Sequence, residues 1–269
     1  MRKFLNLNLD YFLRMRNEIE EEASQLSVES GHSLPEAPIK VVPVTKYLER
    51  DDARLLLDHD QTPLGENRAQ ELEQKTDPGQ DPGSWHFIGK LQRNKISVVA
   101  PRVDLIHSVD SQRLAESLDR WTEDHLNRKL AILVQVNIAG EKQKSSLDPL
   151  EALESIPDWI DRFQNLQFQG LMTMAPLIPA EECRPVFRSL RKLRDDIRQR
   201  VPDEAANFFF HLSMGMSAPG GGDVRTWRWC PHLVVGMSAP GGGVRTWGWG
   251  WPQLVVVSAP VGGDVRTWW

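Results

Sequence analysis

Short runs of branched apolar residues alternate along the chain with longer segments that are apolar on only one face. Short, wholly apolar runs are typical of strands buried on both faces, and one-sided segments are typical of helices that cover a sheet. The pattern predicts strands at residues 39–45, 63–66, 85–88, 103–109, 130–138, 166–174 and 208–214. It predicts helices at 49–58, 67–75, 91–99, 111–125, 148–163 and 181–200.

Strict alternation of strand and helix favours a parallel sheet covered by helices, and eight such units close into a barrel. The chain has 269 residues, which is close to the usual size of that fold. We therefore expect an α/β protein with a (β/α)8 barrel of the TIM type and an eighth unit that is altered or missing. An N-terminal helix is predicted before the barrel, because apolar residues from Leu5 to Leu26 recur every three or four positions.

After Ser217 the alternation ends and the chain nearly repeats itself: "SAPGGGDVRTWRW", "SAPGGGVRTWGW" and "SAPVGGDVRTWW". Repeats stabilise a fold only when each buries an apolar face against its neighbour, and these offer mainly Gly-rich turns and indoles. We divide the chain into a barrel domain, 1–217, and a Gly/Trp-rich tail, 218–269. The tail is expected to be poorly ordered or an artefact of the gene or its reading frame. One of its apolar runs, at 233–235 or 254–257, could still supply the eighth strand.

Composition narrows the class of partner and the compartment. The net charge is −5 and basic residues are spread among acidic ones, so we expect a small-molecule partner and no nucleic acid. The two cysteines, Cys183 and Cys230, form no CxxC pair, which argues against a disulfide framework or a thiolate metal site. The charged N-terminal segment argues against a signal peptide or a membrane span. A reducing cytoplasmic location is expected.

The first predicted strand ends on Lys46, an unusual residue after a buried apolar run. Strand alternation puts Val42, Val44 and Lys46 on one face. If that face is the barrel interior, burial lowers the pKa of the amine, and the neutral amine can then form a Schiff base with a carbonyl compound. The simpler alternative is that Lys46 begins a loop and extends its amine into water.

Polar residues also follow other predicted strands, at the edge where barrels bind their ligands. Asn67 follows the second strand, His86 lies in the third, and Ser213, Gly215 and Ser217 end the seventh. Barrels frequently bind phosphate after the seventh strand, through backbone amides and small residues. Each residue also has a purely structural interpretation: a helix cap, a buried core histidine, or a glycine turn.

Seven segments together resemble one known family. They are "VVPVTK", "GENRAQE", "WHFIGKLQRNK", "HSVDS", "LVQVNIAGEKQKSS", "GLMTMAP" and "HLSMGMS". They are similar to the pyridoxal phosphate homeostasis proteins, a family related to the barrel domain of alanine racemase. The resemblance implies that pyridoxal 5'-phosphate is held as a Schiff base on Lys46. It further implies cofactor contacts from Asn67 and His86 and a phosphate cradle that includes Ser213, Gly215 and Ser217.

The chain departs from that family pattern at its end. The family continues after "MGMS" with an acidic helix and then a strand ending in a "VRIG"-like turn, and here the repeats take their place. Arg225, Arg245 and Arg266 each lie in a "VRTW" that could replace that turn, and the sequence does not decide between them. Ser146 stands where the family usually has glycine.

A racemase needs a second acid or base on the opposite face of the cofactor, supplied in alanine racemase by a tyrosine of a second domain. This chain lacks that domain and has only Tyr11 and Tyr47. The resemblance therefore implies a non-catalytic carrier or regulator of pyridoxal phosphate. Its expected partners are pyridoxal-phosphate-dependent apo-enzymes that accept the cofactor, and the expected assembly is a monomer or weak dimer.

Three alternatives remain open. The first is a racemase-like enzyme that uses pyridoxal phosphate. The second is a metal-dependent barrel hydrolase with His86, His107 and His211 as ligands, although the usual HxH and HExxH spacings are missing. The third treats the Trp-rich tail as an interaction module, with aggregation as its simpler explanation.

Overall fold

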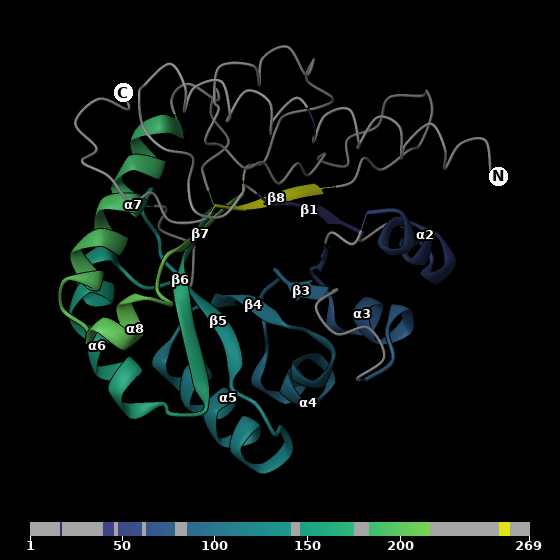
Figure 1. The fold of residues 1–269 in the computed structure, drawn as a ribbon, viewed down its shortest axis with the longest axis horizontal. Coiled ribbons are helices and arrows are strands. Elements are labelled where there is room, and N and C mark those ends of the chain that lie inside the picture. Colours follow the sequence, from purple (N-terminus) through teal and green to yellow (C-terminus); the bar gives the residue numbers. More distant parts are fainter. Residues whose placement is uncertain are drawn as a thin grey trace.

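Seven parallel strands form a curled sheet in the computed structural model, and helices lie around the outside of it (Figure 1). The structure describes residue 17 and residues 40–45, 48–60, 63–78, 85–140, 146–174, 183–215 and 253–258. The parallel strands are β1 (Lys40–Val44), β2 (Leu64–Glu66), β3 (Trp85–Phe87), β4 (Leu105–Val109), β5 (Leu130–Gln135), β6 (Leu166–Met174) and β7 (His211–Gly215). Each pairs with the next along the chain, as the alternating pattern predicted.

The covering helices also follow the predicted order. They are α2 (Arg50–Asp60), α3 (Ala69–Lys75), α4 (Ile96–Val99), α5 (Gln112–His125), α6 (Pro149–Arg162), α7 (Arg184–Arg198) and α8 (Asp203–Ala206). The helix predicted at 91–99 is shorter than expected, because a 3-10 turn, Arg93–Lys95, precedes α4. The predicted N-terminal helix lies outside the described residues, apart from Asn17, which is helical.

The strand predicted at 208–214 begins three residues later, at His211. Phe208 and Phe209 instead continue the turn after α8, since both backbone N–H groups donate to the carbonyl oxygen of Ala205, at 3.0 Å each. Phe209 is fully buried in that turn. An apolar run thus marked a buried segment correctly, but burial alone does not distinguish a strand from a helical turn.

An eighth strand, β8 (Gln253–Ser258), contains the apolar run at 254–257. It pairs with both β7 and β1, and both pairings are antiparallel. The strand order therefore returns to β1, but not in the way of a (β/α)8 barrel, whose eight strands are all parallel. The expected alteration of the eighth unit is thus a reversal of strand direction. The other candidate run, 233–235, lies outside the described residues.

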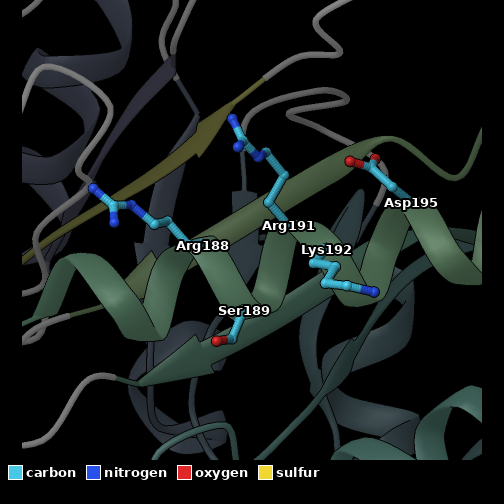
Figure 2. Close-up of a pocket in the computed structure, with 5 residues that line it drawn as sticks. All are labelled: Arg188, Ser189, Arg191, Lys192 and Asp195. Atoms are coloured by element: carbon cyan, nitrogen blue, oxygen red, sulfur yellow. The ribbon is translucent and has the colours of Figure 1, made fainter. Parts of the chain in front are cut away.

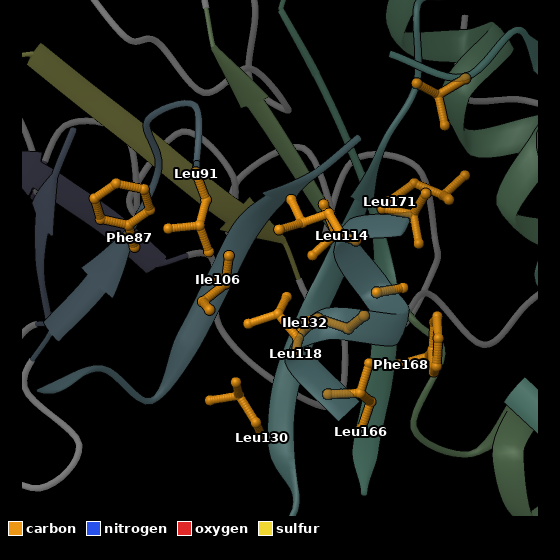
Figure 3. Packing of buried hydrophobic residues seen from close by; sticks show 14 of the residues in the cluster. Phe87, Leu91, Ile106, Leu114, Leu118, Leu130, Ile132, Leu166, Phe168 and Leu171 are labelled. Atoms are coloured by element: carbon orange, nitrogen blue, oxygen red, sulfur yellow. The ribbon is translucent and has the colours of Figure 1, made fainter. Parts of the chain in front are cut away.

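The apolar core fills the space between the sheet and its helices. Figure 3 shows Leu114 and Leu118 of α5 lying over Ile106 and Ile132 of the sheet, and all four side chains are buried. The main stabilising contribution of such contacts is the removal of apolar surface from water, which is worth about 25 cal/mol per Å² buried. The helices therefore hold the strands in place, and the strands in turn fix which side chains meet inside the sheet.

Strand register decides which side chains face the interior of the curled sheet. Val44 pairs with Gly65, Gly65 with His86, and His86 with Leu105, so these positions share one face. His107 lies two residues after Leu105 and touches Ser213 of β7, which is separated from β4 in the sheet by β5 and β6. A contact that spans those strands identifies this face as the concave one.

Candidate functional site

The end of β1 is anchored at Thr45, the residue before Lys46. Its carbonyl oxygen accepts hydrogen bonds from the Nζ of Lys75, at 2.6 Å, and from the backbone N–H of Leu48, at 2.8 Å. Its hydroxyl donates to the Oε1 of Glu66, at 2.7 Å. Thr45 is fully buried, so the peptide group that leads into position 46 is held from two sides. Lys46 and Tyr47 lie outside the described residues.

A buried ion pair connects this anchor to the second strand. The Nζ of Lys75 lies 2.6 Å from the Oε1 of Glu66, and the two side chains are 6% and 0% exposed. The other carboxylate oxygen of Glu66 accepts the backbone N–H of Asn67, at 3.1 Å. The sequence placed Glu66 at a strand end but missed Lys75. The only sequence signal for this ion pair was that an acidic residue at a strand end, Glu66, is followed nine positions later by a basic residue at a predicted helix end, Lys75.

Asn67 follows this ion pair at the end of β2. Its side-chain Oδ1 is buried and has no hydrogen-bond partner in the described part of the chain, an arrangement that costs free energy unless a ligand or water satisfies it. The helix-cap interpretation is wrong, since Arg68 occupies the N-cap position of α3. The backbone of Gly89 packs so closely on Asn67 that an added Cβ would lie 1.9 Å from its carbonyl oxygen. Gly89 thus brings the loop after β3 against the end of β2.

A hydrogen-bonded chain of three buried side chains crosses the concave face. The Nδ1 of His107 lies 2.8 Å from the Oγ of Ser213, and its Nε2 lies 3.0 Å from the Nδ1 of His86. The sequence selected His86 and Ser213 as ligand residues separately. It named His107 only as a metal ligand beside His86 and His211, and nothing in the chain indicated that this residue contacts Ser213.

His107 is neutral in this setting. Burial lowers the pKa of its imidazole well below the usual value, and the charges of His86 and His211 lower it further. A neutral imidazole carries a single N–H, so His107 donates one of its two hydrogen bonds and accepts the other.

The metal-site alternative required His86, His107 and His211 to converge. No group of three or more His, Cys, Asp or Glu side chains suited to a metal ion occurs within the described parts of the chain, which include all three histidines. Among the helices that the structure describes, none is long and apolar enough to cross a membrane.

The other predicted site residues are only partly described. Gly215 is the last residue of β7 and pairs with Met174 of β6. Ser217 lies outside the described residues, as do Arg225, Arg245 and Arg266. Ser146 is described, and its buried Oγ has no hydrogen-bond partner among the residues that the structure describes. The structure therefore brings His86 and Ser213 together through His107 and places Asn67 at the end of the strand next to β3.

A separate cavity of about 380 Å³ lies along α7 (Figure 2). Its lining residues are Arg188, Ser189, Arg191, Lys192 and Asp195. All five belong to the helix layer, and none is a predicted site residue. We do not assign the cofactor to this cavity.

Comparison with known proteins identifies the family. No family model matches the chain. It is 30% identical over 208 residues to the pyridoxal phosphate homeostasis protein of Pasteurella multocida, covering 74% of this chain and 87% of that relative. The chain belongs to this family. The family's Aquifex aeolicus member is 39% identical over 155 residues, which are 57% of this chain and 65% of that protein.

Solved structures agree with the family and the fold. PipY of Synechococcus elongatus without pyridoxal phosphate has a TM-score of 0.58 at 32% identity, covering 65% of this chain and 80% of PipY. PipY with pyridoxal phosphate bound has a TM-score of 0.59 at 27% identity, covering 82% and 97%. An alanine racemase of Clostridium difficile, 12% identical with a TM-score of 0.53, covers 86% and 55% and shares the fold.

Proposed function

We propose that this protein binds pyridoxal 5'-phosphate without catalysis and serves as a carrier or regulator in vitamin B6 homeostasis. In this proposal the cofactor is held as a Schiff base on Lys46. Family membership supports the function, and so does the PipY structure with pyridoxal phosphate bound, which aligns with 82% of this chain.

The observation that carries the Lys46 assignment is the anchored end of β1. Val44 shares the concave face with Gly65 and His86, and in the sequence pattern position 46 has the parity of Val44. The carbonyl of Thr45 is fixed by Lys75 and Leu48, so the chain leaves the strand in a defined direction. A lysine on this face loses hydration, which favours the neutral amine that a Schiff base requires.

The described residues fit a cofactor of this kind. The buried Oδ1 of Asn67 has no hydrogen-bond partner among the described residues, so a bound group could satisfy it. Ser213 lies in the middle of β7 and Gly215 ends the strand, and their hydroxyl and backbone groups suit a phosphate. We assign cofactor contacts to Asn67 and His86, and phosphate contacts to Ser213, Gly215 and Ser217. One of the three "VRTW" arginines would supply the remaining positive charge.

The cofactor supplies an aldehyde and an anionic phosphate, and the protein supplies the amine, the hydrogen bonds and the enclosure. β8 pairs with both β1 and β7 and would complete the wall around the site in place of a parallel eighth strand. Racemisation would need a second acid or base, and the sequence has only Tyr11 and Tyr47 as tyrosines. We therefore favour transfer of the intact cofactor to apo-enzymes, by a cytoplasmic monomer or weak dimer, over turnover of amino acids.

The test is an absorbance spectrum after addition of pyridoxal 5'-phosphate, followed by borohydride reduction and peptide mapping. Wild type should show a Schiff-base band and a reduced adduct on Lys46. Lys46→Ala should lose both, and Lys192→Ala, at an exposed helix position, should keep both. An adduct spread over surface lysines, or equal bands in wild type and Lys46→Ala, would overturn the proposal. Incubation of the loaded protein with L-alanine should yield no D-alanine, and racemisation would favour the enzyme alternative.

A further inference from the structure

The chain His86–His107–Ser213 connects two predicted contact points of the cofactor through the side chain of His107. His107 and Ser213 are fully buried, and His86 is 9% exposed. The two hydrogen bonds measure 2.8 Å and 3.0 Å, and the rings of His86 and His107 lie 5.0 Å apart. Such a chain is directional, because each hydrogen bond needs one donor and one acceptor.

A neutral His107 permits two proton arrangements. In the first, its Nδ1–H donates to the Oγ of Ser213, and its Nε2 accepts the Nδ1–H of His86. The Ser213 hydroxyl proton then remains available to another acceptor. In the second, Ser213 donates to Nδ1, and the Nε2–H of His107 donates to His86. Ser213 then offers only lone pairs to its surroundings.

A phosphate monoester near neutral pH is an anionic acceptor, so it attracts a hydroxyl proton and repels lone pairs. We propose that His107 is a positioning residue for phosphate: it donates to Ser213 and thereby directs the Ser213 hydroxyl proton toward the phosphate of the ligand. This inference rests on the proposed function, in which Ser213 contacts that phosphate. By the same donor and acceptor pairing, a bound phosphate favours the form of His86 that carries its proton on Nδ1.

A purely structural role for His107 predicts something different. If the imidazole only fills space, its replacement disturbs all ligands of the site alike, whether or not they carry phosphate. Pyridoxal, which has the same ring and aldehyde but no phosphate, is therefore the matched probe. An asparagine at position 107 is the matched variant, because its carboxamide nitrogen can donate from nearly the place of Nδ1, whereas phenylalanine cannot donate.

The first experiment measures dissociation constants of pyridoxal 5'-phosphate and pyridoxal for wild type, His107→Phe and His107→Asn, each with and without Ser213→Ala. Loss of one hydrogen bond to a charged group corresponds to about a 10- to 100-fold loss of affinity. We expect that loss for pyridoxal 5'-phosphate in His107→Phe, with pyridoxal affinity changed less than about twofold. His107→Asn should recover most of the affinity, and His107→Phe should add nothing once Ser213 is alanine.

The second experiment uses the wild-type protein and needs no cofactor. Imidazole ¹⁵N NMR distinguishes the two tautomers of His107, and we expect inorganic phosphate to raise the fraction that carries the proton on Nδ1. Equal losses for both ligands in His107→Phe, or a further loss in the Ser213→Ala background, would overturn the inference. So would a tautomer that does not respond to phosphate.

The two proposals fail in different ways. A wild-type protein without a Schiff base on Lys46 contradicts the proposed function. A His107 tautomer that responds to phosphate would still support the positioning role of His107. If the wild-type protein forms the Schiff base on Lys46 but His107→Phe shows no phosphate-specific loss of affinity, only the positioning role of His107 is contradicted.

Discussion

The ammonium group of Lys75 lies 2.6 Å from the backbone carbonyl oxygen of Thr45, the residue that precedes the predicted cofactor lysine. The same ammonium lies 2.6 Å from the buried carboxylate of Glu66. The end of α3 is thereby tied to the ends of both β1 and β2. Lys75 thus contributes to the site through the backbone, although it was not among the predicted site residues.

Lys75→Met should lower the free energy of unfolding by about 3–5 kcal/mol, because it leaves the Glu66 carboxylate buried without its counter-charge. The measurement is urea unfolding at pH 7.5. Lys192→Met is the matched control, since Lys192 and Asp196 also lie 2.6 Å apart but are 76% and 36% exposed. That exposed pair should contribute about 0.5 kcal/mol or less.

Adding Glu66→Gln to Lys75→Met should recover part of the lost stability, because the uncompensated charge is removed. If Lys75→Met costs no more than Lys192→Met, the buried pair is not the anchor we describe.

Gly89→Ala should destabilise the protein and weaken cofactor binding together. The new Cβ would lie 1.9 Å from the carbonyl oxygen of Asn67, so the loop after β3 must move away from β2. Overpacking of this kind costs about 1–3 kcal/mol. Gly140→Ala is the control, since it has a φ of +68° but no atom within 4 Å of the added Cβ. That variant should pay only a backbone cost of about 1–2 kcal/mol and bind cofactor normally.

Protein stability should fall below about pH 6.5, and His107 should cause part of that fall. Burial lowers the pKa of His107 in the folded protein, whereas in the unfolded chain the imidazole titrates near about 6.5. Above that pH neither state binds the proton. Below it only the unfolded state does, so the free energy of unfolding decreases by about 1.4 kcal/mol per pH unit until the folded pKa is reached.

The check is urea unfolding between pH 7.5 and 5.5 for wild type, His107→Asn and the exposed control His125→Asn. The slope with pH should be smaller by this amount in His107→Asn, and His125→Asn controls for the loss of an exposed imidazole. A parallel slope in wild type and His107→Asn would show that His107 is protonated in the folded protein as easily as in the unfolded chain.

Asn67→Ala should weaken binding of pyridoxal 5'-phosphate by roughly tenfold, the equivalent of one hydrogen bond. Its effect on the unliganded protein should be small, because the Oδ1 of Asn67 accepts no hydrogen bond from the described residues. Titration followed by absorbance measures the first quantity, and thermal unfolding without cofactor measures the second. A variant that loses stability but keeps its affinity would assign Asn67 to the scaffold instead of the site.

Much of the fold was predictable because it depends on local patterns. The nine-residue strand β6 was predicted with both its ends correct, since its first residues alternate between apolar and polar and Asn165 and Pro176 flank it closely. The start of β7 was predicted three residues early, because the apolar run Phe208 to Phe210 is equally compatible with a buried turn and with a strand. The direction of β8 could not be read from its apolar run, because strand direction is set by pairing with β1 and β7.

In the candidate site, too, some features follow from local sequence patterns and others depend on tertiary contacts. The sequence by itself determined the order of strands and helices and the family resemblance, and it proposed Asn67, His86 and Ser213 as candidate site residues. Only the tertiary structure decided that His107 links His86 to Ser213 across the concave face, and that Lys75 reaches back to Thr45. The reason is that periodicity reports which face a residue lies on, whereas contacts between distant strands depend on register and curvature of the whole sheet.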